Sequence, residues 1–165
     1  MVLSFQDCHK LAIISVRKFG TVLLAESRQE FIETKGIGTD ALSLDEEGFV
    51  EMMEAKRWRI KSALMDQTTI SGIGNMYSDE ILYHAGIKPD KKVNDFGKKD
   101  LETVYEKMIF VLTTAIENGA DSEKMPGNYL IRRREAGAIC GICGGKIENI
   151  KIAGRSAYFC SKHQK

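Results

Sequence analysis

The sequence predicts a mostly α-helical protein with a small amount of β-structure, in which a helical domain precedes a metal-bound β-hairpin. Three features support this fold class: a long run of apolar residues at helical spacing, a glycine-rich turn between shorter helical segments, and a cysteine–histidine motif in the last quarter of the chain. The chain has 165 residues, 43% of them hydrophobic, which suits one or two small globular domains. No apolar run approaches the length of a membrane span, so we expect no membrane partner.

Residues 1–28 form the predicted β-part. Residues 11–16 and 21–24 are rich in branched apolar side chains and predict two strands, with a bend at Gly20 between them. Two strands leave one face of a sheet uncovered, so we interpret this segment as the edge of a larger β-domain. If the chain self-associates, we expect it to do so through these exposed strands.

Residues 29–123 are predicted to form the helical domain. Ser43 and Glu46 have the spacing of a capping box, which predicts a helix that begins near Leu44. The strongest periodic signal predicts a long amphipathic helix that ends near Asn118. Its apolar face, which we expect to pack in the core, contains Leu101, Val104, Tyr105, Met108, Ile109, Leu112, Ala115 and Ile116.

Two shorter helices are predicted at residues 60–65 and 76–85, and Gly86 is placed to end the second. Between them lies a turn with two glycines, Gly72 and Gly74. Such a turn leaves backbone N–H groups open to close approach, and a helix that begins at about Asn75 adds its own unpaired N–H groups. A phosphate fits such a place. A plain tight helix–turn–helix explains the same residues, and the local sequence leaves both interpretations open.

Residues 124–165 are predicted to form a linker and a zinc ribbon. The four ligand candidates are Cys140, Cys143, Cys160 and His163, and they come in two chelating pairs, which is typical of a structural zinc site. Glycines at 144, 145 and 154 and short β-like runs between the pairs predict a hairpin. The alternatives are a disulfide or a redox Cys-x-x-Cys, but no thioredoxin-like pattern surrounds the motif and Cys8 is far away in the sequence. A single histidine near a terminus is often only solvated, which keeps the fourth ligand open.

The number of cysteines and the distribution of charge indicate where the protein is located in the cell and what kind of partner it binds. Three of the four cysteines lie in the metal motif and no targeting segment is evident, which suits a reducing, cytoplasmic setting. Residues 124–165 carry nine basic and two acidic side chains, a net charge of +7, whereas residues 1–123 carry a net charge of −6. This asymmetry favours a polyanionic partner, although a solvated basic tail would have the same composition. A second basic cluster spans residues 56–61 and contains the single tryptophan, Trp58.

Several of these segments, taken together, resemble one family of DNA base-excision-repair enzymes, the formamidopyrimidine-DNA glycosylase/endonuclease VIII family. Residues 64–67, 72–80 and 85–89 resemble the helix–two-turns–helix motif of that family. Residues 154–164 resemble its closing zinc-finger signature, although the family usually has a fourth cysteine where this chain has His163. Residues 17–20 resemble the segment that ends the N-terminal domain of the family.

The resemblance implies a fold, a partner and roles for particular residues. The fold is a helix–two-turns–helix domain and a zinc finger, preceded by a β-remnant of an N-terminal sandwich domain. The partner is double-stranded DNA, damaged or abasic, and the cofactor is zinc. Asn75 and Arg155 would hold the phosphates that flank the damaged nucleotide, with Lys61 as a weaker phosphate candidate. Phe19 would wedge between bases, and Arg17 would contact the orphaned base.

The resemblance also indicates what is missing for catalysis. Family members begin, after removal of methionine, with a proline whose secondary amine attacks the sugar, followed by a glutamate. This chain begins Met1-Val2-Leu3 and contains only Pro89 and Pro126. We therefore expect it to lack the nucleophile, its acidic partner and the catalytic lysine of a DNA glycosylase/AP lyase. Whether the chain is an enzyme stays open. The alternatives are a complete non-catalytic, zinc-dependent DNA-binding module and a zinc-ribbon protein-interaction module.

Overall fold

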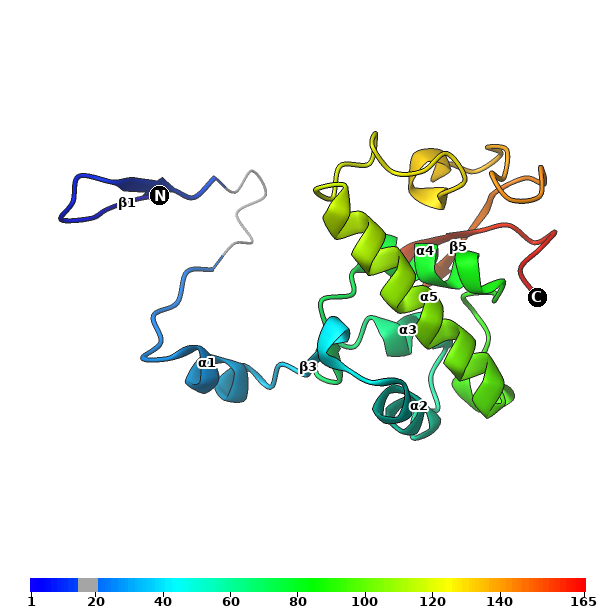
Figure 1. Ribbon diagram of the computed structural model, residues 1–165, viewed down its shortest axis with the longest axis horizontal. Helices are drawn as coiled ribbons and strands as arrows, with labels where there is room; N and C mark the ends of the chain where they lie inside the picture. Colours follow the sequence, from blue (N-terminus) through cyan, green and yellow to red (C-terminus); the bar gives the residue numbers. More distant parts are fainter. Residues whose placement is uncertain (15–20) are drawn as a thin grey trace. The chain divides into compact units, whose positions relative to one another are not determined.

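The computed structural model describes residues 1–14 and 21–165, which divide into two compact units (Figure 1). The N-terminal unit is Met1–Lys35 and the C-terminal unit is Gly36–Lys165. Among the described residues, no helix combines the length and the apolar character that a bilayer crossing requires.

The N-terminal unit contains a short hairpin and one helix. Strand β1 (Val2–Ser4) pairs antiparallel with β2 (Lys10–Ala12), and helix α1 (Arg28–Lys35) follows. Of the strand predicted over residues 11–16, Leu11 and Ala12 lie in β2, Ile13 and Ile14 have no strand conformation, and residues 15 and 16 lie outside the described residues. The strand predicted over residues 21–24 is wrong, because these residues have no strand conformation and pair with no strand that the structure describes. A β-favouring composition stabilises a strand only when a partner strand satisfies its backbone groups.

The helices of the C-terminal unit surround one core, over which α5 (Lys98–Glu117) runs across α4 (Asn75–Ala85) and α2 (Glu46–Glu54) (Figure 1). The predicted apolar face of the long helix packs into this core, with one exception: Ile116, which was expected on the same face, is 64% exposed. The buried residues of α5 are Leu101, Val104, Met108, Val111, Leu112 and Ala115. The remaining elements of this unit are β3 (Thr39–Asp40), η1 (Ala41–Ser43), α3 (Ile60–Leu64), β4 (Ile70–Ser71), η2 (Val93–Asp95) and η3 (Leu130–Arg133).

The start of α2 corrects one prediction. The helix begins at Glu46, and Asp45 is its N-cap, with its carboxylate accepting the Gly48 N–H at 2.9 Å. Ser43 is instead the last residue of η1. The Asp45 carboxylate directly precedes the helix and accepts an N–H of the first turn as well as a serine hydroxyl would. Asp45 therefore caps the helix in place of the predicted Ser43.

Helix α4 ends as predicted, at Gly86. This glycine is left-handed (φ +71°), and its N–H bonds back to the last turn of the helix. The C-terminus of the chain docks at the same place: the Lys165 N–H donates to the Gly86 carbonyl at 2.8 Å, and the buried Gln164 amide donates to the Ile87 carbonyl at 2.7 Å. The residues that directly follow His163 are thereby attached to the end of α4.

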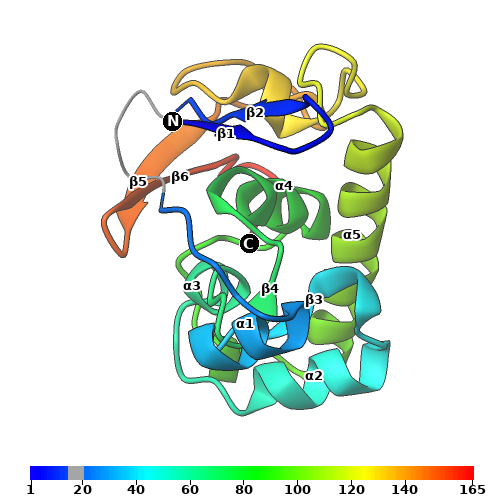
Figure 2. The same ribbon diagram turned by 90° about the vertical axis from the view of Figure 1, so that its left-hand side faces the viewer.

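The predicted ribbon hairpin is confirmed. Strands β5 (Glu148–Ile152) and β6 (Arg155–Phe159) pair antiparallel, and Ile152 lies opposite Arg155. The two turn residues, Ala153 and Gly154, have φ of +47° and +76°, which matches the right-handed twist of a tight hairpin. Strand β6 packs against α4, as Figure 2 shows. The hairpin tip is therefore held at a defined position relative to the helices.

Candidate functional site

The metal motif folds into one cluster. The ligand atoms of Cys140, Cys143, Cys160 and His163 all lie within 4.8 Å of one another. Three thiols and one imidazole form a closed four-ligand set that fits a structural zinc ion and leaves no open position for substrate. Because Cys140 and Cys160 are themselves buried among Tyr83, Leu130 and Ile147, the cluster is also the small core of the ribbon.

Tyr83 of α4 adjusts the chemistry of the cluster. Its hydroxyl lies 3.0 Å from the Cys140 sulfur, and burial raises the pKa of this hydroxyl, so it stays protonated and is the donor. Burial also raises the pKa of the Cys140 thiol, but the hydrogen bonds from Tyr83 and from the backbone N–H groups of Cys143 and Ile142 outweigh it and lower the pKa to about 6. Cys140 is thus prepared as a thiolate ligand. Burial raises the pKa of Cys160 to about 11, so a metal would have to displace the proton of this thiol.

The orientation of His163 supports its role as the fourth ligand. Its Nε2 lies 3.0 Å from the Tyr83 carbonyl oxygen, which can only accept, so Nε2 carries the proton. The other ring nitrogen, Nδ1, lies 3.5 Å from the Cys140 sulfur and faces the cluster with its lone pair. The Tyr83 ring packs edge-on against the imidazole, with 4.8 Å between centroids. A histidine with one nitrogen fixed by a carbonyl and the other free is the usual arrangement of a metal ligand.

The two-glycine turn is held open by Gln67. The Gln67 side-chain oxygen accepts the Gly72 N–H at 3.2 Å, and its amide donates to the Ile73 carbonyl at 2.8 Å. Gly72 has φ +97°, which a residue with a side chain adopts only under strain. Gly74 is the N-cap of α4 and has no side chain to bond the first N–H groups of the helix. The first turn of α4 therefore has no side-chain cap among the described residues.

Asn75 is the first residue of α4 and is half-buried. Its side-chain oxygen is buried and has no hydrogen-bond partner among the described residues. A buried amide oxygen without a partner costs free energy, and functional sites are where such groups are usually found. The side chain of Asn75 is thus uncommitted to the fold at the point where the helix dipole and the free N–H groups favour an anion.

Lys61 is not where a phosphate ligand would be. Its side chain is fully buried, and its ammonium donates to the Asn75 carbonyl at 2.9 Å, to the Ser78 hydroxyl at 2.9 Å and to the Asp79 carboxylate at 2.6 Å. These three bonds use all the donors of an ammonium group, which leaves none for DNA. The interpretation of Lys61 as a phosphate candidate is therefore replaced by a positioning role: Lys61 attaches α3 to the first turn of α4.

Asp79 connects the helical turn to the ribbon, a role that no sequence motif predicted. One carboxylate oxygen accepts from Lys61. The other accepts from the Arg134 guanidinium at 2.7 Å and from the Tyr158 backbone N–H at 3.2 Å. Arg134 also lies over the Tyr158 ring, 4.5 Å from its centroid. The sequence did contain one signal for this role: Asp79 lies close to the apolar residues Ile81 and Leu82, which suggests that it is buried. A buried carboxylate requires hydrogen-bond or ion-pair partners.

The neighbouring Glu80 holds the segment before the ribbon in the same way. Its buried carboxylate accepts the Leu130 N–H at 2.8 Å and the Ile131 N–H at 2.7 Å, which are the first donors of η3. Two consecutive acidic residues of α4 therefore bind two different parts of the chain. The short helix η3 was not expected from the sequence, where its residues adjoin the predicted linker.

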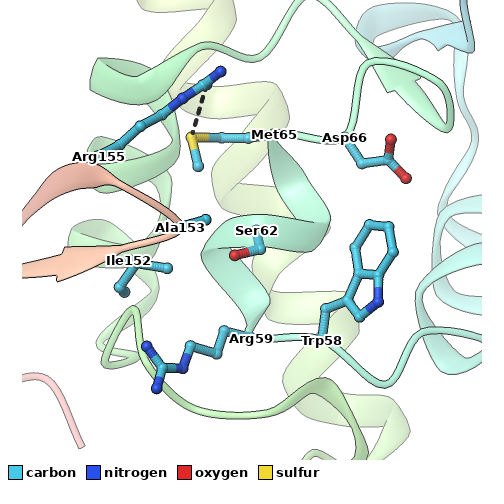
Figure 3. Close-up of a pocket in the computed structure, with 8 residues that line it drawn as sticks. All are labelled: Trp58, Arg59, Ser62, Met65, Asp66, Ile152, Ala153 and Arg155. Carbon is cyan, nitrogen blue, oxygen red and sulfur yellow. Dashed lines mark hydrogen bonds between the residues drawn. The ribbon is translucent and has the colours of Figure 1, made fainter.

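Arg155 lies at the start of β6 and is exposed. Its guanidinium reaches back toward α3, where one nitrogen lies 3.7 Å from the Met65 sulfur (Figure 3). Arg155 thus contacts Met65, the C-cap of α3, and Asn75 is bonded through its carbonyl to Lys61 of the same helix. Both predicted phosphate contacts, Asn75 and Arg155, therefore lie next to α3. The remaining two predicted DNA contacts, Arg17 and Phe19, lie outside the described residues.

Comparisons with a family model and with known proteins point to the same family. A family model described as the formamidopyrimidine-DNA glycosylase H2TH domain matches residues 37–126. A Listeria innocua protein named formamidopyrimidine-DNA glycosylase is 31% identical over 182 residues, which cover 100% of this chain and 66% of the relative. A protein of the same name from Prochlorococcus marinus is 35% identical over 173 residues, covering 95% and 59%. The chain thus spans two thirds of these relatives or less.

Two of the solved structures that are similar to this chain are complexes with DNA. The structure of MutM in complex with carbocyclic 8-oxo-G containing DNA has a TM-score of 0.77 and 31% identity, covering 91% of this chain and 60% of that one. The complex between the Lactococcus lactis Fpg and an abasic site containing DNA has a TM-score of 0.70 and 30% identity, covering 82% and 54%.

Proposed function

The chain belongs to the formamidopyrimidine-DNA glycosylase family, and from this premise we propose that its C-terminal unit binds double-stranded DNA at a damaged or abasic nucleotide. The observation that carries the proposal is the placement of two anion contacts around α3. On one side, the first turn of α4 offers free backbone donors and the uncommitted side chain of Asn75. On the other, the exposed Arg155 projects from the hairpin. Two such contacts suit successive phosphates of one DNA strand.

The charge distribution supports the same partner. The excess of seven positive charges over residues 124–165 belongs to the segment that carries the ribbon, whereas the rest of the chain is acidic. Phosphate neutralisation releases counterions and supplies most of the sequence-independent affinity for DNA. We therefore expect binding to weaken steeply as salt concentration rises, with little dependence on base sequence.

In this proposal zinc has a structural role. The four ligands would hold the ion in a closed site, where it fixes the ribbon and performs no bond cleavage. The protein's own contacts then direct Arg155: His163 and Tyr83 attach the metal cluster to α4, and Asp79 attaches β6 to the same helix. The hairpin and the two-glycine turn are thereby held as one rigid binding surface.

Replacing Arg155 with alanine is expected to weaken binding to an abasic-site duplex by about 10- to 100-fold, the range for loss of a charge-assisted hydrogen bond. The dependence of affinity on salt should also become shallower by about one released counterion. Both are measured by fluorescence anisotropy with a labelled duplex over a salt series. Lys99→Ala removes an equal charge from an exposed position on α5 and is the matched control. Equal affinities of the R155A variant and the wild-type chain at physiological salt would refute the phosphate role and favour a protein-interaction module.

The chemistry of the family is a separate part of the proposal. We propose that this chain alone does not cleave the glycosidic bond or the abasic-site strand, because its two prolines, Pro89 and Pro126, lie within the chain and their nitrogens are amides. An amide nitrogen cannot form the Schiff base that a secondary amine forms with an opened sugar. Borohydride trapping on abasic-site DNA is expected to give no covalent adduct. An adduct formed by this chain alone would overturn the non-catalytic assignment.

A further inference from the structure

The surface between α3 and the hairpin tip contains a pocket, and Arg155 is the one proposed phosphate contact that lines it. The pocket has a volume of about 580 Å³ and is open to solvent (Figure 3). One side of the pocket is formed by α3 and the residues directly before and after it. The other side is formed by the tip of the β5–β6 hairpin. The residues that line it are Trp58, Arg59, Ser62, Met65, Asp66, Ile152, Ala153 and Arg155.

Trp58 is the unusual member of this lining. It is the single tryptophan of the chain and is 51% exposed. Large aromatic side chains on a surface are typical of binding sites, because they offer a wide apolar face at a small cost in conformational entropy. One face of the indole lies under the Lys56 ammonium, which is 5.0 Å from the ring centroid, and an ammonium covers one face only. Ring surface therefore remains available for a ligand.

The backbone around Trp58 is fixed. The Trp58 carbonyl accepts the Val93 N–H at 2.9 Å, and the Ile60 N–H donates to the Lys91 carbonyl at 2.8 Å. Arg59 and Lys92 form a β-bridge between these two bonds. The exposed indole thus stands on a rigid support, as a preorganised stacking surface does.

The charges around the pocket favour an anionic ligand. Arg155 and Arg59 both line the pocket, and in Figure 3 their side chains lie on either side of the hairpin residues Ile152 and Ala153. The single acidic lining residue, Asp66, is neutralised by Lys56, whose ammonium lies 3.0 Å from the carboxylate. Partial burial raises the pKa of Asp66, but hydrogen bonds from Thr68, Thr69 and Lys56 outweigh it and hold the pKa well below its usual range, so this ion pair persists. The two guanidinium groups are then the lining charges without an ion-pair partner among residues 1–14 and 21–165.

We propose that this pocket binds an unpaired nucleotide next to the damaged site, with its base stacked on Trp58 and its phosphate held by Arg155. The proposal rests on the proposed function, because Arg155 is shared between the flanking phosphate and the pocket. It requires an unpaired nucleotide, since the faces of a paired base are covered by its neighbours in the duplex. A nucleotide has the two chemical parts that the pocket recognises, a flat π-face and an anion.

Two DNA ligands test this proposal. One is a fully paired duplex with a single tetrahydrofuran abasic-site analogue, and the other is the same duplex with two mismatched pairs on each side of the analogue. Because the chain has one tryptophan, its fluorescence reports Trp58 alone. We expect the mismatched duplex to quench this emission strongly and the paired duplex to leave it nearly unchanged. Equal quenching by both duplexes would show that the indole contacts backbone rather than a base, and would overturn the proposal.

Affinities of variants give an independent readout. Trp58→Ala is expected to weaken binding of the mismatched duplex by about 5- to 100-fold, the range for loss of one stacked base, and to change binding of the paired duplex less than about twofold. Trp58→Phe should retain most of the affinity, which excludes a general effect on folding. If the wild-type chain binds the paired duplex in an Arg155-dependent way but W58A affects neither ligand, only the nucleotide pocket is refuted. If the wild-type chain binds neither duplex, the proposed function fails as well.

Discussion

Removal of the metal is expected to unfold the ribbon and abolish DNA binding. Among the described residues, the buried cluster around the ligands has five members, and two of them, Cys140 and Cys160, are themselves ligands. A core of this size cannot offset the conformational entropy of residues 138–165 without the metal. Metal binding supplies about 10–16 kcal/mol of apparent free energy in zinc-finger peptides at neutral pH, which makes this the largest effect expected in the molecule.

The measurement combines elemental analysis with unfolding. We expect about one zinc per chain, a thermal transition that moves sharply downward with a strong chelator, and recovery when zinc is restored. Cys143→Ser should reproduce the effect of the chelator. Cys8→Ser is the matched control, because Cys8 is an exposed cysteine outside the cluster. A protein that contains no zinc and melts at the same temperature with and without chelator would disprove the metal centre.

Replacing Asp79 with alanine is expected to destabilise the C-terminal unit by about 3–5 kcal/mol, because it leaves buried positive charge without its partner. The side chains of Asp79 and Lys61 are both 0% exposed, and Arg134 on the other carboxylate oxygen is 19% exposed. Burial already lowers the pKa of Lys61, and the Asp79 carboxylate opposes this effect. Without Asp79, Lys61 must either lose its proton or draw water into the core.

Urea denaturation measures this effect, as a lower midpoint with an unchanged slope. The matched control is Asp121→Ala, which breaks the exposed ion pair with Lys124 and should change stability by less than about 1 kcal/mol. Asp79→Ala should also weaken DNA binding beyond the loss of folded protein, because the Tyr158 N–H loses its acceptor and β6 is less firmly attached to α4. A variant as stable as the wild-type chain would contradict the network.

The sequence was informative wherever the signal is local. The long helix, the stop at Gly86 and the hairpin turn at Gly154 follow from periodicity and from backbone conformations that neighbouring residues decide. The ligand spacing likewise predicted the cluster around Cys140, because a chelating pair is a local arrangement. The predicted strand over residues 21–24 failed for the opposite reason: a strand depends on a partner that composition does not specify.

By itself, the sequence determined the helical class of this protein, its metal-binding hairpin and the family to which it belongs. Only the tertiary structure decided which charged residues face solvent. Lys61 and Arg155 are both basic residues near a predicted contact, but one is buried against Asp79 and the other is exposed on the hairpin. The pocket at Trp58 likewise joins residues almost a hundred positions apart. Burial and long-range ion pairs depend on how segments that are distant in the sequence pack together. The pattern of residues along the chain does not specify which segments pack against each other.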